Sequence, residues 1–277
     1  MIRLVLTDMD GTLLPAGWEH VSPLALEAIA ALDAAGVRFG PASGRDLDDV
    51  ASFFYDDPSR MRVAVLSNGQ KIRLDGKLVK AMPYDRSGLE RLKALIDQTP
   101  GTILCVPVDG EPSLVMGPAA ERTGEFPPSW FPVGVRVVDE LPEGDVAKAG
   151  IACFGTLEHC AEVMATFAAA VPEIRFVCPI NQWFDLIVPG WSKAEGIKWL
   201  CGHLGLSLDE VCVFGDSDND AEMLALVPNS VAVAGASPAA GAAARWHIGP
   251  ACDDSVAQAL MEIAEATSEG RLPSFMS

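Results

Sequence analysis

Two aspartates, Asp8 and Asp10, stand one residue apart at the end of the first apolar run of the chain, residues 2–6. In an extended chain residues i and i+2 lie on the same side, so the two carboxylates can converge if the strand persists through Met9. Carboxylates held together at the end of a buried strand repel each other, and they require a cation, a shared proton or a reaction that uses the charge. The pair therefore predicts a site that does chemistry.

The residues that follow the pair suit a phosphate group and a divalent cation. Gly11 allows a sharp turn, and Thr12 offers a hydroxyl and a backbone amide. An EF-hand calcium loop is excluded, because counting from Asp8 places Leu13 where that loop needs glycine. A solvated turn with two incidental acids stays open at this point, and a second acidic segment would decide against it.

A second acidic segment stands near the far end of the chain. An apolar run at 211–214 leads into Gly215 and the sequence Asp-Ser-Asp-Asn-Asp at 216–220. An EF-hand fails here too, because Ala221 and Val227 occupy its glycine and glutamate positions. Parallel strands present ligands at their carboxyl ends, so neighbouring strands would bring both acidic segments into one site. Such hard oxygen ligands favour Mg²⁺ beside a substrate phosphate.

Two further polar residues complete a site for a phosphate dianion. Ser43 stands in a turn of small residues after the predicted strand 37–41, where its hydroxyl could donate to a phosphate oxygen. Lys193 opens a predicted helix after Pro189 and Gly190, and it could supply the positive charge that the dianion needs. Taken singly, neither is a specific signal, because a serine after a strand is more often a turn or cap residue and a lysine in a first helical turn is usually solvated.

In this order the four segments resemble the four motifs of the haloacid dehalogenase (HAD) superfamily of phosphohydrolases. The chain is most similar to the Cof-type branch, subfamily IIB. The principal matches are Asp8 to Thr12, Ser43, Lys193 and Gly215 to Asp220, and the secondary matches are 67–69, 184–189 and 223–224.

The resemblance implies a chemical role for the acidic and basic residues. Asp8 would be the nucleophile that becomes an aspartyl phosphate, and Asp10 would protonate the leaving alcohol and then activate water. The backbone carbonyl of Asp10 would bind Mg²⁺ together with the carboxylates of Asp8 and Asp216. Lys193 and the cation would neutralise the encounter between an anionic nucleophile and an anionic ester.

The resemblance also implies the groups that bind the phosphate. Ser43 and Asn219 would bind its non-bridging oxygens, and Gly11 and Thr12 would belong to the phosphate-binding loop. Asp220 would hold the metal or its waters from close by. Asp218 is expected to be a surface acid.

Composition narrows the class of partner. The chain has 277 residues, a net charge of −18 and a pI near 4.5, a field that repels nucleic acid and anionic membranes. A small phosphorylated metabolite is therefore the expected partner. Seven cysteines without a C-x-x-C pair predict reduced thiols in a cytoplasmic protein. No signal peptide is expected because Asp8 interrupts the first apolar run, and no membrane span because the uncharged stretch 223–244 is rich in alanine and contains two prolines.

The elements that must position these residues alternate between strand and helix at both ends of the chain. This alternation predicts an α/β domain with a doubly wound, Rossmann-like parallel sheet. The domain is formed by two segments of the chain, 1–83 and 190–277. Its expected strands are 3–7, 37–41, 63–67, 211–214 and 231–233, and its expected helices are 23–35, 47–54, 193–204 and 221–226.

The middle of the chain, 84–189, follows a different pattern. Runs of strands with two helices predict an inserted α+β module, which resembles the cap of this subfamily and would control water and the choice of leaving group. The expected helices are 87–98 and 157–170, and the expected strands are 103–108, 114–116, 135–138, 150–154, 174–177 and 184–188. The segment 127–132 is expected to be a rigid surface loop with buried aromatic side chains, and lining of the substrate pocket is the alternative.

These observations predict a Mg²⁺-dependent phosphatase of small phosphorylated metabolites, with sugar phosphates as the leading substrate class. A phosphomutase of the same superfamily is the nearest alternative. A metabolite-binding regulator without turnover and a receiver-like signalling protein are the others. The sequence fixes neither the individual substrate nor the oligomeric state.

Overall fold

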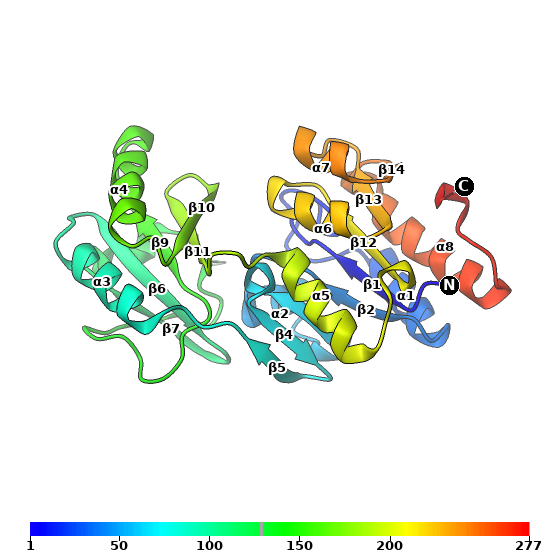
Figure 1. The fold of residues 1–277 in the computed structure, drawn as a ribbon, viewed down its shortest axis with the longest axis horizontal. Helices are drawn as coiled ribbons and strands as arrows, with labels where there is room; N and C mark the ends of the chain where they lie inside the picture. The colour runs from blue at the N-terminus through cyan, green and yellow to red at the C-terminus, as the bar shows by residue number, and fades with distance from the viewer. Residues whose placement is uncertain (128–129, 277) are drawn as a thin grey trace. The chain divides into compact units, whose positions relative to one another are not determined.

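A computed structural model describes residues 1–127 and 130–276 of the chain. It forms two compact units, which are described separately. Unit 1 comprises Met1–Arg45, Val50–Lys80 and Ser192–Ser277, and unit 2 comprises Asp46–Asp49 and Ala81–Trp191. Figure 1 traces the elements of both units along the chain.

Unit 1 is built on a five-stranded parallel sheet with the strand order β14-β13-β12-β1-β2. Strands β1 and β12 are buried throughout, as expected for central strands of a parallel sheet that is covered on both faces. The predicted α/β fold with a parallel sheet is confirmed. The strands are β1 (Leu4–Thr7), β2 (Arg38–Pro41), β12 (Val211–Gly215), β13 (Asn229–Val233) and β14 (Trp246–Ile248).

Four of the helices around this sheet, α1, α2, α5 and α6, begin and end within one residue of the predicted bounds, whereas α8 was not predicted. Ser22 caps α1 by accepting a hydrogen bond from the amide of Ala25, and Pro23 occupies the first turn. Alternate residues of β1 and β12 pack against α5 and α6, while α1 and α8 contact each other. The helices are α1 (Pro23–Ala34), α2 (Leu47–Phe53), α5 (Lys193–Leu204), α6 (Ala221–Leu226), α7 (Pro238–Ala243) and α8 (Ser255–Glu269).

The third predicted strand pairs differently from the prediction. β3 (Val63–Leu66) lies in a three-stranded sheet with β4 (Lys71–Leu74) and β5 (Lys77–Ala81), where it pairs antiparallel to β4. It lies beside β2, and a parallel bridge between Ala42 and Val65 joins it to the five-stranded sheet. The chain can fold back because Asp75 and Gly76 both have positive φ, the conformation of a tight hairpin turn.

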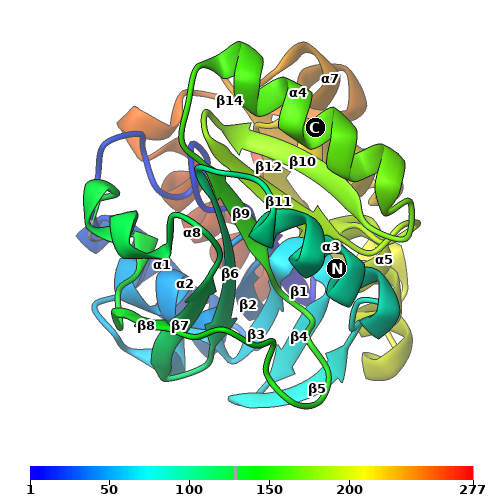
Figure 2. The same ribbon diagram turned by 90° about the vertical axis from the view of Figure 1, so that its left-hand side faces the viewer.

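Unit 2 is the α+β module that the sequence predicts. Its six-stranded sheet has the order β10-β11-β9-β6-β7-β8, antiparallel except between β7 and β8. The strands are β6 (Thr102–Val108), β7 (Glu111–Met116), β8 (Val135–Val137), β9 (Gly150–Cys153), β10 (Arg175–Ile180) and β11 (Trp183–Ile187). Helices α3 (Arg86–Asp97) and α4 (Leu157–Ala170) lie beside this sheet (Figure 2) and share one apolar core with it.

A second apolar cluster of unit 2 contains Ile103, Cys105 and Val115 of the sheet, with several aromatic side chains packed against it. Among these, Phe126 stacks on Trp130 with ring centroids 4.8 Å apart. The predicted segment 127–132 falls partly here, although residues 128 and 129 lie outside the described part of the chain.

None of the helices in the described residues combines the length and the hydropathy that a bilayer span requires. The uncharged stretch 223–244 is divided among α6, β13 and α7.

Candidate active site

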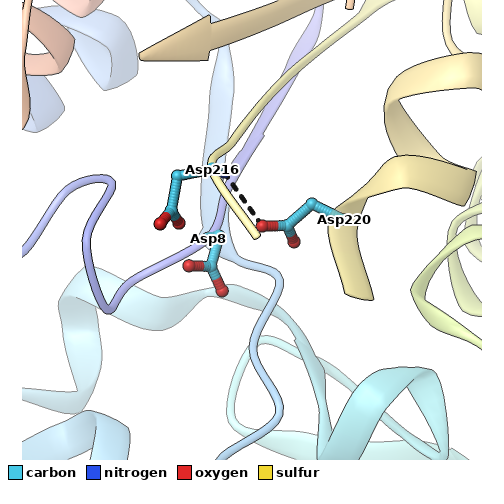
Figure 3. Close-up of side chains that lie close together, drawn as sticks. All are labelled: Asp8, Asp216 and Asp220. Carbon is cyan, nitrogen blue, oxygen red and sulfur yellow. Dashed lines mark hydrogen bonds between the residues drawn. The ribbon is translucent and has the colours of Figure 1, made fainter. Parts of the chain in front are cut away.

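Three carboxylates meet at the carboxyl edge of the parallel sheet (Figure 3). Asp8 follows β1 and Asp216 follows β12, and these two strands are neighbours with Thr7 opposite Phe214. Asp220 ends the short 3-10 turn η6 (Asp218–Asp220). One carboxylate oxygen from each aspartate lies within 4.8 Å of the others, so the three could hold a metal ion. The adjacency of β1 and β12 thus joins two acidic segments that are remote in sequence.

Lys193 places a positive charge inside this group. It is the first residue of α5 and is fully buried, and its Nζ lies 2.6 Å from Asp8 Oδ1 and 2.6 Å from Asp220 Oδ1. Three carboxylates and one ammonium group leave an excess of two negative charges. A divalent cation would balance that excess, and oxygen ligands suit Mg²⁺.

The pKa values of the site reflect burial and mutual repulsion. Burial raises the pKa of Asp8 well above its usual range, Asp220 raises it further, and Lys193 opposes both. Burial also raises the pKa of Asp216, against the hydrogen bond from Thr12. Although burial by itself lowers the pKa of Lys193, the charges of Asp220 and Asp8 together raise it above its usual range. The fully ionised site is therefore costly unless a cation is bound.

The raised pKa of Asp216 gives a pH-dependent prediction for stability. The pKa of Asp216 in the folded state exceeds the ordinary value of 3.8. Above pH 3.8 the folded protein therefore keeps a proton on Asp216 that the unfolded chain loses. The free energy of unfolding falls as the pH rises through this range. In EDTA we expect the Asp216→Asn variant to melt at a higher temperature than the wild type near about pH 7, with a smaller gap near about pH 4. Thermal melts at both pH values measure the gap, and a gap independent of pH would contradict this expectation.

Asp220 shapes the loop that carries Asp216. Its Oδ1 accepts a hydrogen bond from Lys193, and its Oδ2 accepts from the amides of Asp216 and Ser217, each at 3.0 Å. The bond to the Asp216 amide is drawn in Figure 3. Gly215 is required beside it, because a Cβ there would lie 2.7 Å from the Cβ of Asp220. Both oxygens of Asp220 are thus engaged, whereas one oxygen of Asp8 lies free of the lysine contact.

The first loop supports Asp216 from the other side. Thr12 Oγ1 donates to Asp216 Oδ1 at 2.8 Å. Gly11 has φ +85°, and a Cβ on it would lie 2.6 Å from Asp216 Oδ2. Thr12 therefore holds the Asp216 carboxylate by a hydrogen bond, and Gly11 leaves room for that carboxylate. The predicted contact of both residues with phosphate stays a prediction.

The carboxylate of Asp10 is not one of the three in this group and is paired with Arg45. The guanidinium donates from Nε to Asp10 Oδ2 at 2.6 Å and from Nη2 to Oδ1 at 2.9 Å. Such a two-point pair fixes the carboxylate more firmly than a single contact. Sequence reasoning missed Arg45, although its place two residues after Ser43 in a turn beside the first strand could have indicated it.

Ser43 and Asn219 are held by neighbours in unit 1. Ser43 is buried, and its Oγ accepts from the amide of Arg45 at 3.1 Å, an arrangement in which its hydroxyl proton can point to another acceptor. Asn219 is exposed, and its Nδ2 donates to Oδ1 of Asn68 at 3.2 Å. Asn68 was noted in the sequence only as part of a secondary match.

Comparisons with known proteins agree on the family. A model of the haloacid dehalogenase-like hydrolases matches residues 5–260. The 5-amino-6-(5-phospho-D-ribitylamino)uracil phosphatase YbjI of Escherichia coli K12 is 26% identical, over 90% of this chain and 91% of its own. The HMP-PP phosphatase of Escherichia coli O6:H1 is 27% identical, over 86% of each chain.

Solved structures share the fold. A haloacid dehalogenase-like hydrolase from Bacteroides thetaiotaomicron superposes with a TM-score of 0.80 at 20% identity, over 95% of this chain and all of that one. A sugar phosphatase of subclass IIB gives a TM-score of 0.77 at 20% identity, over 93% and 97% of the two chains. The chain therefore belongs to the haloacid dehalogenase-like hydrolase family, as an enzyme of the phosphoric monoester hydrolase type.

Proposed function

We propose that this enzyme hydrolyses small phosphorylated metabolites with the help of Mg²⁺, through an aspartyl phosphate on Asp8. The observation that carries the proposal is the buried contact of Lys193 with Asp8 and Asp220, beside Asp216 at the same sheet edge. A buried ammonium that holds an acid at a strand end is suited to orient a nucleophile and to offset the charge of its target.

The residues present fit a divalent cation, because the site carries an excess of negative charge and raised pKa values at Asp8 and Asp216. In this proposal the carboxylates of Asp8 and Asp216 and the backbone carbonyl of Asp10 hold Mg²⁺. Asp220 acts from close by through the loop and Lys193. When bound, the cation supplies charge neutralisation for the phosphoryl group.

In the first half of the reaction, Lys193 holds Oδ1 of Asp8 and the other oxygen attacks phosphorus. The bond between phosphorus and the leaving oxygen breaks, and Asp10 supplies the proton to that oxygen. In the second half, water attacks the phosphorus of the aspartyl phosphate and Asp10 takes a proton from that water. The bond between phosphorus and the Asp8 oxygen breaks, which releases inorganic phosphate and restores the Asp8 carboxylate. Because Arg45 engages both oxygens of Asp10 in this structure, Asp10 must leave at least one of these bonds to donate a proton.

The phosphoryl oxygens are bound by Ser43 and Asn219 in this proposal, with Gly11 and Thr12 in the surrounding loop. Unit 2 acts as the cap, with the predicted boundaries of 84–189 for the insertion and of 1–83 and 190–277 for the core. A cap supplies side chains that contact the leaving group and exclude water.

Sugar phosphates are the leading substrate class. The names of the two relatives place a phosphorylated ribityl compound and HMP-PP among family substrates, and one structural neighbour is a sugar phosphatase. All are small phosphorylated molecules, which supports the same class here. A cytoplasmic location is part of the proposal and is supported by the odd number of cysteines, seven, and by the lack of any C-x-x-C pair among them.

A phosphate-release screen over sugar phosphates, nucleotides and cofactor phosphates tests the function. We expect EDTA to lower turnover at least about a hundredfold and Mg²⁺ to restore it, because the cation neutralises charge in the transition state. Ca²⁺ should restore little, since it prefers longer bonds and more ligands. Full turnover in EDTA would reject the metal requirement, and isomerised ester with little free phosphate would assign a phosphomutase instead.

A further inference from the structure

The turn η2 (Ser67–Gly69) between β3 and β4 has an unusual backbone. Its three residues have φ of +53°, +54° and +92° in succession. Ser67 and Asn68 are not glycine, and residues that carry a side chain rarely adopt this left-handed backbone conformation. Such a conformation persists only where surrounding contacts stabilise it, and residues in it are found most often at functional sites.

The contacts that hold the turn come from two segments of the candidate site. The amide of Ser67 donates to the carbonyl of Arg45 and that of Asn68 to the carbonyl of Ser43, each at 2.9 Å. Gly69 packs against the start of α5, since a Cβ on it would lie 2.3 Å from the carbonyl oxygen of Ser192. The turn is therefore fixed against the chain segments that carry Ser43 and Lys193.

The side chain of Asn68 reaches a third segment. Its Oδ1 accepts the hydrogen bond from Nδ2 of Asn219. Its carboxamide also lies against Gly44, where a Cβ would be 3.2 Å from both Nδ2 and Oδ1. Asn68 is only 5% exposed, whereas Asn219 is exposed at the surface of the site. The carboxamide of Asn68 thus lies between the turn after Ser43 and the residue proposed to bind phosphate.

We propose that Asn68 is a positioning residue. It accepts one N–H of the Asn219 carboxamide and so orients the second N–H of the same amino group toward the transferring phosphoryl group. This inference rests on the proposed function, in which Asn219 binds a non-bridging oxygen. A carboxamide has a donor end and an acceptor end, and its terminal torsion is broad and roughly two-fold. Without a fixed acceptor, Asn219 can turn its carbonyl oxygen toward the phosphate, which repels it.

Asparagine at this position has a simpler explanation that the proposal must exclude. Asparagine tolerates the left-handed conformation better than most residues, so position 68 could require nothing but its backbone. The Asn68→Gly variant separates the two explanations, because glycine adopts this φ freely and lacks the carboxamide. A backbone role predicts a fully active variant, and a positioning role predicts a loss.

Asp254 provides a matched control. It has φ +54° and ψ +28°, close to the +54° and +37° of Asn68, and it precedes α8. Asp254→Gly makes the same kind of backbone change outside the residues of the candidate site. We expect its turnover and its melting temperature to match the wild type closely.

The experiment measures kcat, KM and competitive inhibition by inorganic phosphate, with Mg²⁺ present and with the best ester from the screen. For Asn68→Gly we expect kcat/KM to fall roughly tenfold and the inhibition constant of phosphate to rise by a similar factor, as for one lost or misdirected hydrogen bond to a charged group. Because Asn68 acts through Asn219, the double variant Asn68→Gly with Asn219→Ala should be no slower than Asn219→Ala alone.

The outcomes separate this inference from the proposed function. If the wild type releases phosphate and Asn68→Gly keeps its kcat/KM and phosphate inhibition, the positioning role is wrong while the phosphatase function stands. Additive losses in the double variant would also reject it, because independent effects imply no coupling between the two side chains. If the wild type releases phosphate from no ester, the proposed function fails and this inference fails with it. Melting temperatures of all variants show whether a loss reflects unfolding.

Discussion

The Asp8→Asn variant is expected to release phosphate at least about 10⁴ times more slowly than the wild type. An amide oxygen is a far weaker nucleophile than a carboxylate, so the aspartyl phosphate cannot form at a useful rate. The variant keeps the size of the side chain, and Lys193 keeps its partner Asp220. Single-turnover phosphate release measures the effect, and intact-protein mass shows whether a phosphoenzyme forms on the wild type alone.

Stability distinguishes the loss of a nucleophile from unfolding. Since burial raises the pKa of Asp8, the ionised carboxylate is costly in the folded protein, and removing its charge should not lower the melting temperature in EDTA. Asp218→Asn is the matched control, because this exposed acid lies in the same acidic segment and has no assigned role. Undiminished turnover by Asp8→Asn would reject the nucleophile assignment.

Replacing Lys193 by Met is expected to damage both the chemistry and the fold. The change leaves Asp8 and Asp220 buried without a counter-charge, a defect that costs about 3–5 kcal/mol of unfolding free energy. The melting temperature should fall by roughly 10 °C for a protein of this size. Turnover should fall at least about 10³-fold, because the pKa of Asp8 rises further without the ammonium and the approach of a phosphate dianion is no longer offset.

Two companion variants show whether the buried charges cause the instability. Lys198→Met removes an exposed lysine that pairs with Glu195 on the same helix, and it should change stability by less than about 1 kcal/mol. Adding Asp220→Asn to Lys193→Met removes one of the orphaned charges, so part of the lost stability should return. If Lys193→Met has the melting temperature of the wild type, the buried ion pairs make no net contribution to the free energy of unfolding.

The chemistry of single segments could be predicted from the sequence. An apolar run that ends in acids and glycine is a local signal, because strand burial and sharp turns depend on neighbouring residues. The predicted start of α5 at Lys193 agrees with the structure, and the predicted α/β core and α+β module are confirmed. The roles of Asp10, Ser43 and Asn219 stay predictions, since their side chains are placed but no reaction has tested them.

Other features of the fold were not predicted. Strands β4 and β5 were not predicted, because their lysines and arginine interrupt the alternation of apolar and polar residues that indicates a strand. The sequence Asp75-Gly76 between them is nevertheless typical of a hairpin turn. The small sheet they form with β3 moves that strand out of the parallel sheet. Strands pair through backbone hydrogen bonds, which every residue type except proline can form. The composition of a strand therefore does not specify which neighbouring strand it pairs with.

The amino-acid sequence by itself determined which residue types could act on a phosphate and in what order along the chain they occur. Only the tertiary structure decided their partners: Arg45 for Asp10 across 35 positions, Asn68 for Asn219 across 151, and Thr12 for Asp216 across 204. The spacing of apolar residues along a short segment indicates whether the segment is a helix or a strand and which of its faces is buried. This spacing depends only on residues close together in the sequence. Pairs separated by tens to hundreds of residues depend on strand order and on how loops pack at one edge of the sheet, and no short stretch of sequence contains that information.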